Sequence, residues 1–248
     1  MGSSMPLPYF EELRRALGEI ERRSAQAIRT AGDWVAEAVE QDHLVWVFGS
    51  GHAGIMADES FYRAGGPACA GPIHLPGLLT TDKPITLTTE NERRDGYAAE
   101  RMAAVPVHAG DVLVVHSVSG RNPAPVEVAQ EGKRRGARTV GILSAEWART
   151  LAPRSAMGAR LLDVVDLVID NCVPPGDACV SLQGMTVRCC PLSSAVGIAI
   201  LHSIFAAAWE VLIAKGLEPP VFRSANEEGG DEWNRRLLDR YRGRFGHL

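Results

Sequence analysis

The stretch VVHSVSGRNPAPVEVAQEGKRRGARTVGIL, residues 114–143, decides the fold of this chain. It continues a β-branched apolar run at residues 112–115, which is short enough to be a buried parallel strand. A helix is predicted to begin after Asn122 with Pro123, because proline suits the first turn of a helix. Residues 139–143 are then predicted to form a second buried strand. The stretch therefore predicts a strand, a loop, a helix and a parallel strand in succession.

The loop of this unit is rich in hydroxyl groups and backbone amides. Ser117, Ser119 and Gly120 follow the carboxyl end of the strand and face the start of the helix. The first amides of a helix lack partners, and the helix dipole favours negative charge there. We therefore expect the two serines, together with the amides around Gly120 and Asn122, to bind an anion such as phosphate.

The same order of strand, loop and helix recurs along the chain. A predicted strand at residues 44–48 precedes the loop GSGHAG, residues 49–54, and a helix at 55–64. This alternation predicts an α/β fold, a three-layer α/β/α sandwich around a parallel sheet. Ligands of such sheets bind beyond the carboxyl ends of the strands, where both loops lie. Further strands are expected at 69–75 and 167–170, and helices at 95–104 and 193–215.

Additional helices are expected at both ends of the chain. A helical region at residues 9–40 is predicted to break near Thr30, Ala31 and Gly32, and Asp231 is predicted to cap a final helix. The expected division is an N-terminal helical region at 1–33, a central domain at 34–215 and a C-terminal loop and helix at 216–248. Residues 1–4 are expected to be left over from cloning.

Composition narrows the class of protein. The chain has 248 residues, 46% of them apolar, which is enough for one large α/β core. A net charge of −4 and a pI near 6.0 argue against nucleic-acid binding. No membrane span is expected, because polar residues interrupt the apolar run 195–214, and no secretory signal is expected either. Five cysteines without paired spacing favour a reducing cytoplasm.

The first loop lacks a nucleotide motif. Gly54 follows Gly49 and Gly51 at the wrong interval for the dinucleotide fingerprint, and the phosphate loop ending in Gly-Lys-Ser or Gly-Lys-Thr is missing. The two loops are therefore predicted to hold a single phosphate without a nucleotide.

The sequences VFGSGHAG, residues 47–54, and SVSGRNPAPVEVAQEGKRRGARTVGIL, residues 117–143, resemble the sugar isomerase (SIS) domain of phosphosugar isomerases and phosphosugar-binding proteins. The paired features ENERRDGYA and PVFRSANEEGGDEWN are similar to an uncharacterised bacterial subgroup of this family. The resemblance implies a flavodoxin-like sheet and a phosphosugar held by Ser50, Ser117 and Ser119, and we expect Gly51 to contribute to the same phosphate site. It also implies a homodimer or homotetramer with sites completed by neighbouring subunits. The sequence departs from the family at Ala53, where many members carry a polar residue.

The resemblance extends to phosphoheptose isomerases, more distantly. Those enzymes carry a glutamine and, eight residues later, a histidine on a C-terminal helix; here Ser194 and His202 stand at these positions. They also carry a histidine and a glutamate on the helix after the first loop, where this chain has Glu59 and Arg63. An isomerase built on this sequence would therefore use a rearranged base.

Aldose–ketose isomerisation needs a base beside the carbonyl and an acid for the oxygens. Glu59, on the helix that leaves the first loop, is the predicted base, and His202 is predicted to act on the oxygens. The structural alternatives are an exposed Glu59 paired with Arg63 at i+4 and a core histidine at 202.

His52, inside the first loop, is predicted to contact phosphate or substrate. Its alternatives are a helix cap and a zinc site shared with Glu59 and His202. No cofactor is predicted, with a divalent metal such as zinc as the alternative.

Cys189 and Cys190 are expected to point to opposite faces of a strand and so not to share a metal. The run 90–94 is interpreted as solvated surface, with a charged active-site rim as the alternative. The run 224–231 is interpreted as a turn before the final helix, with contacts to sugar hydroxyls as the alternative.

The predicted function is a cytoplasmic phosphosugar isomerase that interconverts aldose and ketose sugar phosphates through an enediol. Two alternatives stay open: a phosphosugar sensor, which needs the same serines but no base, and an etherase or deaminase-like lyase acting on an amino-sugar phosphate. The partners expected are the phosphorylated sugar and further copies of the chain, with no nucleic acid and no membrane.

Two histidines near strand ends, His74 and His116, are weaker candidates for the site, whereas His43, His108 and His247 are expected at the surface.

Overall fold

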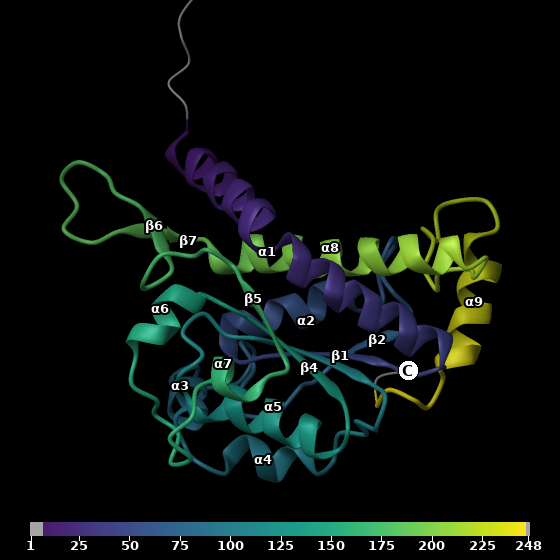
Figure 1. The fold of residues 1–248 in the computed structure, drawn as a ribbon, viewed down its shortest axis with the longest axis horizontal. Coiled ribbons are helices and arrows are strands. Elements are labelled where there is room, and N and C mark those ends of the chain that lie inside the picture. Colours follow the sequence, from purple (N-terminus) through teal and green to yellow (C-terminus); the bar gives the residue numbers. More distant parts are fainter. Residues whose placement is uncertain (1–6, 247–248) are drawn as a thin grey trace, which may run out of the picture.

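The computed structural model describes residues 7–246, so the expectations for residues 1–4 and for His247 lie outside the described residues. Five parallel strands form one sheet in the order β2-β1-β3-β4-β5, with helices on both faces (Figure 1). This flavodoxin-like order confirms the predicted three-layer sandwich. The strands are β1 (Val45–Gly49), β2 (Ala70–Pro72), β3 (Val112–His116), β4 (Arg138–Leu143) and β5 (Leu167–Asp170).

The helices divide between the two faces of the sheet (Figure 1). One face carries α1 (Pro8–Glu40), α2 (Ile55–Ser60) and α8 (Ser193–Ala214). The other carries α3 (Thr86–Glu92), α4 (Tyr97–Met102), α5 (Pro123–Arg134) and α7 (Leu161–Val164). The turn η1 (Gly51–Gly54) joins β1 to α2, and α6 (Ala145–Thr150) follows β4. An antiparallel hairpin of β6 (Ala178–Val180) and β7 (Cys189–Pro191) projects from the sandwich (Figure 1).

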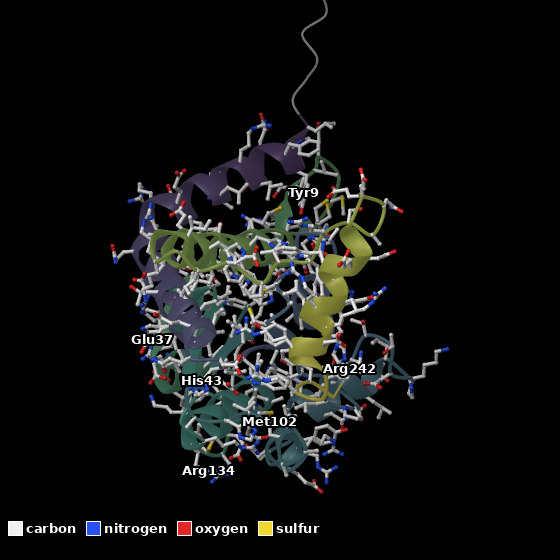
Figure 2. The ribbon with its side chains drawn as sticks, turned by 90° about the vertical axis from the view of Figure 1, so that its right-hand side faces the viewer. Tyr9, Glu37, His43, Met102, Arg134 and Arg242 are labelled. Atoms are coloured by element: carbon white, nitrogen blue, oxygen red, sulfur yellow. The ribbon has the colours of Figure 1, made fainter. Side chains whose placement is uncertain are left out.

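The last helix, α9 (Gly230–Tyr241), closes the β2 side of the molecule, and Figure 2 looks onto this side with Arg242 at the lower end of the helix. The chain after α9 returns to the core, where the Phe245 ring meets the Trp46 ring edge-on at 5.2 Å. The N-cap of α9 is Gly229, whose φ of 75° is left-handed, and Asp231 lies in the first turn. The prediction of Asp231 as N-cap was therefore wrong.

The helix α1 runs without a break from Pro8 to Glu40, so the predicted interruption near Thr30, Ala31 and Gly32 was wrong. A Cβ added at Gly32 would lie 2.7 Å from Ala207 Cβ and 3.1 Å from the Ala208 nitrogen. The glycine therefore allows α1 and α8 to approach closely rather than ending the helix. This packing outweighs the helix penalty of a glycine, which is about 1 kcal/mol.

The central strands β1 and β3 are buried throughout, as expected for a parallel sheet covered on both faces. The buried Asp111 carboxylate fixes their relative position, because it accepts the Leu44 amide and the Trp46 indole N–H, each at 2.9 Å. In the resulting register, Gly49 lies beside His116 at the carboxyl ends. The loops that follow these two strands are thereby brought side by side.

Three predicted elements are shorter in the structure. The helix expected at 55–64 ends at Ser60, and Tyr62 beyond it has a φ of 43°. The strand expected at 69–75 is reduced to the three residues of β2. The helix expected at 95–104 begins only at Tyr97, because Gly96 in front of it takes a left-handed φ of 80°.

The helix α8 corrects the expectation that no segment reaches membrane-spanning length. By length and composition it could cross a bilayer, since its few polar residues leave the helix strongly apolar. It packs along α1 on one face of the sheet (Figure 1). Core helices of α/β proteins have the same composition, so this packing accounts for the apolar residues on the buried face of α8.

Candidate functional site

A cleft of about 310 Å³ opens at the carboxyl ends of β1 and β3. It contains the first-loop residues Ser50 and His52 and the second-loop residues Ser117 and Ser119, all four of which were predicted to bind phosphate or substrate. The structure thus brings the two predicted loops together around one space. The full lining consists of Ser50, His52, Ala53, Glu92, Ser117, Val118, Ser119, Trp147, Gly176, Asp177 and Ser193.

The first loop turns sharply to present Ser50 and His52. A Cβ at Gly49 would lie 2.3 Å from the Ala53 carbonyl, so only glycine permits the turn. Gly51 has a φ of +54°, and its amide donates to the Leu78 carbonyl at 2.8 Å. Gly51 therefore shapes the turn, and its amide is not open to a ligand. It lines a neighbouring cavity of about 200 Å³ instead of the serine cleft.

The second loop holds its own shape through Ser117 and Gly120. The buried Ser117 Oγ accepts the Gly120 amide at 3.2 Å, and Gly120 has a φ of +59° with a buried backbone. The Ser119 hydroxyl makes no hydrogen bond within residues 7–246, and the amides of Ser119 and Asn122 are also unused there. Ser119 is consequently the serine of this loop that is free to bind an anion, with the start of α5 behind it.

Asn122 lies at the start of α5 but does not line the cleft. Its Nδ2 donates to Glu92 Oε1 at 3.0 Å, and its Oδ1 accepts from Arg154 Nη1 at 3.1 Å. Its side chain therefore positions the Glu92 carboxylate, which does line the cleft. Glu92 belongs to the charged run 90–94, so part of that run contributes to the cleft as well as to the surface.

Glu59 and His202 approach each other, with Glu59 Oε1 3.5 Å from His202 Nε2. The same carboxylate is paired with Arg63 at i+4, so the structural alternative for Glu59 is also realised. Neither residue lines the serine cleft. On α8, His202 comes nine positions after Ser193, which lies at the cleft, and nine steps of a helix rise by about 13 Å.

The environment of His202 favours its neutral form. Partial burial and the positive charge of Arg63 both lower the pKa of His202. A neutral imidazole can take a proton at one nitrogen and donate at the other. His202 is therefore expected to carry a neutral ring near neutral pH.

Within the described residues 7–246, no three His, Cys, Asp or Glu side chains lie together as a metal site. His52 lines the cleft, whereas Glu59 and His202 pair outside it. Cys189 and Cys190 were expected to point apart, but their Sγ atoms lie 3.6 Å from each other. The expectation failed because Cys190 adopts a left-handed φ of 62°, which breaks the alternation of a regular strand.

Seven lining residues were not predicted as site residues, and four of them have polar or aromatic side chains: Glu92, Trp147, Asp177 and Ser193. Asp177 accepts the Ser193 amide and the Ser193 hydroxyl, each at 2.7 Å, and so caps α8 at the cleft. Trp147 comes soon after β4, and Asp177 lies in the loop after β5. Their position beyond the carboxyl ends of predicted strands was the available signal.

The histidines outside the cleft have other partners. The ring of His116 is fully buried, with Nδ1 3.1 Å from the Ala53 carbonyl. His74 Nε2 lies 2.6 Å from Asp58 Oδ1 beside the smaller cavity. His43 is half-buried near Asp111, whereas His108 is exposed.

Comparisons with known proteins agree with the resemblance seen in the sequence. The SIS domain family model matches residues 8–144. A UPF0309 protein of Shouchella clausii is 39% identical over 234 residues, which cover 94% of this chain and 95% of the relative. A UPF0309 protein of Oceanobacillus iheyensis is 37% identical, with 97% and 98% covered.

Two solved structures have a similar fold. The phosphoheptose isomerase of Neisseria gonorrhoeae gives a TM-score of 0.53 at 17% identity, covering 81% of this chain and 95% of that one. The phosphoheptose isomerase of Francisella tularensis gives 0.52 at 17% identity, covering 81% and 94%.

Proposed function

Because the chain belongs to the SIS domain family, we propose that it binds a phosphorylated sugar in the serine cleft and interconverts its aldose and ketose forms. The observation that carries the proposal is the convergence of Ser50, His52 and Ser119 on one cleft that also holds a carboxylate, Glu92. Hydroxyls and helix-start amides suit a phosphate, and a carboxylate suits proton abstraction from the sugar carbon.

The phosphate is held at the second loop by the hydroxyl and the backbone amide of Ser119, which lines the cleft. Ser50 and His52 approach from the first loop, with Ser117 and Gly120 keeping the second loop in shape. This arrangement leaves the sugar carbons toward the rest of the cleft. The reaction then needs a base for the carbon-bound proton and an acid for the oxygens.

Glu59 is the proposed base and His202 the proposed acid, supported by the 3.5 Å approach of Glu59 Oε1 to His202 Nε2. Their distance from Ser193 along α8 favours a site completed by a second copy of the chain. Glu92 is the competing base, because its carboxylate lines the cleft of the same subunit. The two candidate bases, Glu59 and Glu92, therefore predict different effects of mutation.

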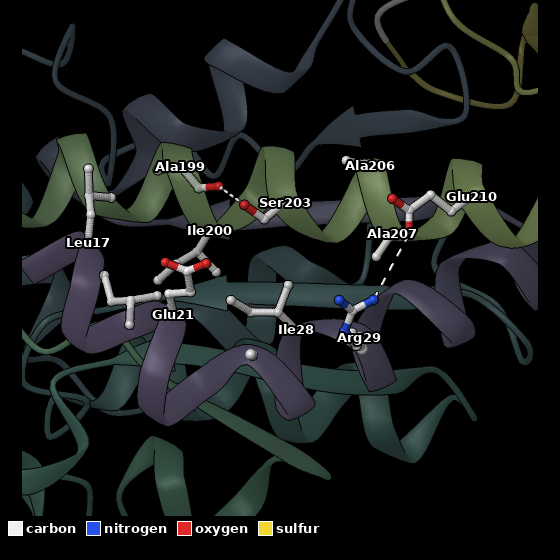
Figure 3. A pocket seen from close by; sticks show the side chains of 12 residues that line it. Leu17, Glu21, Ile28, Arg29, Ala199, Ile200, Ser203, Ala206, Ala207 and Glu210 are labelled. Atoms are coloured by element: carbon white, nitrogen blue, oxygen red, sulfur yellow. Dashed lines mark hydrogen bonds and ion pairs between the residues drawn. The ribbon is translucent and has the colours of Figure 1, made fainter.

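We further propose a homo-oligomer assembled through a groove between α1 and α8 (Figure 3). The groove has a volume of about 360 Å³, and Leu17, Ile28 and Ala206 are among its apolar lining residues. Arg29 Nη1 and Glu210 Oε2 lie 4.0 Å apart at its edge. An apolar groove with a charged rim is typical of a subunit contact.

A cytoplasmic location is supported by the five cysteines, all of which are free thiols.

The test is hydrogen exchange with C5 to C8 sugar phosphates and amino-sugar phosphates in deuterated water, followed by NMR. An isomerase incorporates deuterium beside the carbonyl, because the enediol exchanges its proton with solvent. Loss of exchange in Glu59→Gln but not in Glu92→Gln assigns the base to Glu59, and the reverse assigns it to Glu92. Binding without exchange identifies a sensor, and ether cleavage or ammonia release identifies a lyase; either result contradicts the isomerase.

A further inference from the structure

We propose that the serine cleft continues into a second anion subsite, formed by Arg121, Arg154 and Arg93, which binds a carboxylate or a second phosphate on the sugar ligand. The inference rests on the proposed function, since it concerns the far end of the same ligand. It narrows the substrate class to phosphorylated sugars that carry two acidic groups.

Arg121 follows Gly120 directly in the second loop and lacks a partner for its guanidinium. Its Nε is buried without a hydrogen bond, and its side chain forms no ion pair within residues 7–246. Buried N–H groups are nearly always paired, and a charged one left unpaired costs more than a neutral one. An acceptor supplied by a ligand would satisfy this group.

Arg154 stands next to Arg121, because its backbone amide donates to the Arg121 carbonyl at 2.9 Å. The one side-chain hydrogen bond that Arg154 makes in the described part of the chain goes to Asn122 Oδ1. Loss of hydration and the positive charges of Arg121 and Arg93 lower the pKa of Arg154. Arg121 and Arg93 therefore each lie close enough to Arg154 for their positive charges to act on its guanidinium.

Little negative charge lies beside these three arginines to balance their positive charge. Glu92 is the nearby carboxylate that opposes the lowered pKa of Arg154, and its Oε1 already accepts from Asn122. Elsewhere in the molecule, half-buried arginines such as Arg23, Arg135 and Arg160 each pair with a carboxylate. Arg121, which is also half-buried, differs from these arginines because it has no carboxylate partner within residues 7–246, and the cluster therefore carries excess positive charge.

The position of the cluster ties it to the cleft. Asn122 bridges Arg154 to Glu92, and Glu92 lines the cleft that contains Ser119. A phosphate at Ser119 and an anion at Arg121 would therefore belong to one ligand. Guanidinium groups bind carboxylates and phosphates with paired N–H donors, so either group fits.

The test compares ligands that differ by one acidic group. Calorimetry at fixed ionic strength measures dissociation constants for glucose 6-phosphate against 6-phosphogluconate, and for fructose 6-phosphate against fructose 1,6-bisphosphate. The wild type is expected to bind the more acidic member of at least one pair about tenfold more tightly, as charged hydrogen bonds predict. The pair that shows the preference identifies carboxylate or phosphate as the second group.

Arg121→Gln and the exposed Arg154→Gln are each expected to reduce that preference at least threefold. Arg235→Gln removes the same charge from α9 and should leave it in place, which separates a local subsite from overall charge. If the Arg121→Gln variant folds poorly, the Arg154→Gln variant still tests the subsite. Equal affinity for both members of both pairs, with glucose 6-phosphate or fructose 6-phosphate still bound, would overturn the subsite alone. A lack of binding by every sugar phosphate would overturn the proposed function together with it.

Discussion

His116 links the two loops of the cleft, because it ends β3 directly before Ser117 and its ring contacts the first loop. Its ring is fully buried, and because a carbonyl oxygen only accepts, Nδ1 carries the proton and donates to the Ala53 carbonyl at 3.1 Å. The other nitrogen faces Gly197 of α8, where an added Cβ would lie 3.1 Å away, and finds no partner in the described residues. Burial lowers the pKa of His116 below its ordinary 6.5. The neutral ring therefore holds the first loop on the end of β3.

This burial predicts a pH-dependent stability. Below about pH 6.5 the unfolded chain binds a proton at His116 that the native state does not, so the free energy of unfolding falls as the pH falls toward the lowered native pKa. The slope from one such group is at most about 1.4 kcal/mol per pH unit. Urea unfolding between pH 7.5 and 5 should show a steeper fall for the wild type than for His116→Gln. The pKa of His202 is also lowered, so the His202→Gln variant measures how much of the fall in stability belongs to that histidine. Identical pH profiles of wild type and His116→Gln would contradict this role.

The residues of the cleft differ in how far sequence predicts them. Ser50, His52, Ser117 and Ser119 were found because each follows a predicted strand, and the carboxyl ends of neighbouring parallel strands meet at one edge. Glu92 was not selected, because a run such as ENERR has the same pattern on a solvated surface as in a rim. Its placement depends on the hydrogen bond from Asn122, a contact between distant segments that periodicity does not encode.

Helix α1 allows two glycine substitutions to be compared within one element. An alanine at Gly32 would meet Ala207 Cβ at 2.7 Å, whereas an alanine at Gly18 would meet nothing within 4 Å. Gly32→Ala is expected to destabilise the protein by about 1–3 kcal/mol, because it overpacks the contact with α8. Gly18→Ala is expected to stabilise it by up to about 1 kcal/mol through helix propensity. Thermal and urea unfolding of both variants measure these changes. An equal gain in stability from both would show that α1 and α8 do not pack closely at Gly32.

The elements themselves were predicted well where periodicity is strong. The buried strands β3 and β4, and α5 between them, follow from an apolar run and from Pro123. The break in α1 was wrong because a glycine that ends a helix and one that admits a distant helix look alike in sequence. The hairpin of β6 and β7 was missed because two residues that are not glycine, Asp177 directly before β6 and Cys190 within β7, adopt left-handed conformations.

The groove between α1 and α8 carries the proposed subunit contact (Figure 3). Leu17, 37% exposed, lines this groove, and Leu87, 38% exposed, lies on α3 at the opposite face of the sheet. Leu17→Glu is expected to convert the oligomer to monomer in light scattering, because it places a charge in an apolar contact, whereas Leu87→Glu should leave the mass unchanged. A wild-type protein that is monomeric at micromolar concentration, or a Leu17→Glu variant that stays assembled, would contradict the contact.

The most direct test of phosphosugar binding is the affinity of the whole protein for sugar phosphates, measured by calorimetry with the wild type and with Ser119→Ala. Ser119→Ala should weaken binding of the best ligand at least tenfold while leaving the melting temperature nearly unchanged, because its hydroxyl has no internal partner to lose. Thr30→Val, which removes a hydroxyl that bonds within α1 to the Gln26 carbonyl, should leave the affinity unchanged. Unaltered affinity in Ser119→Ala, or binding of no sugar phosphate by the wild type, would contradict the assignment of the cleft.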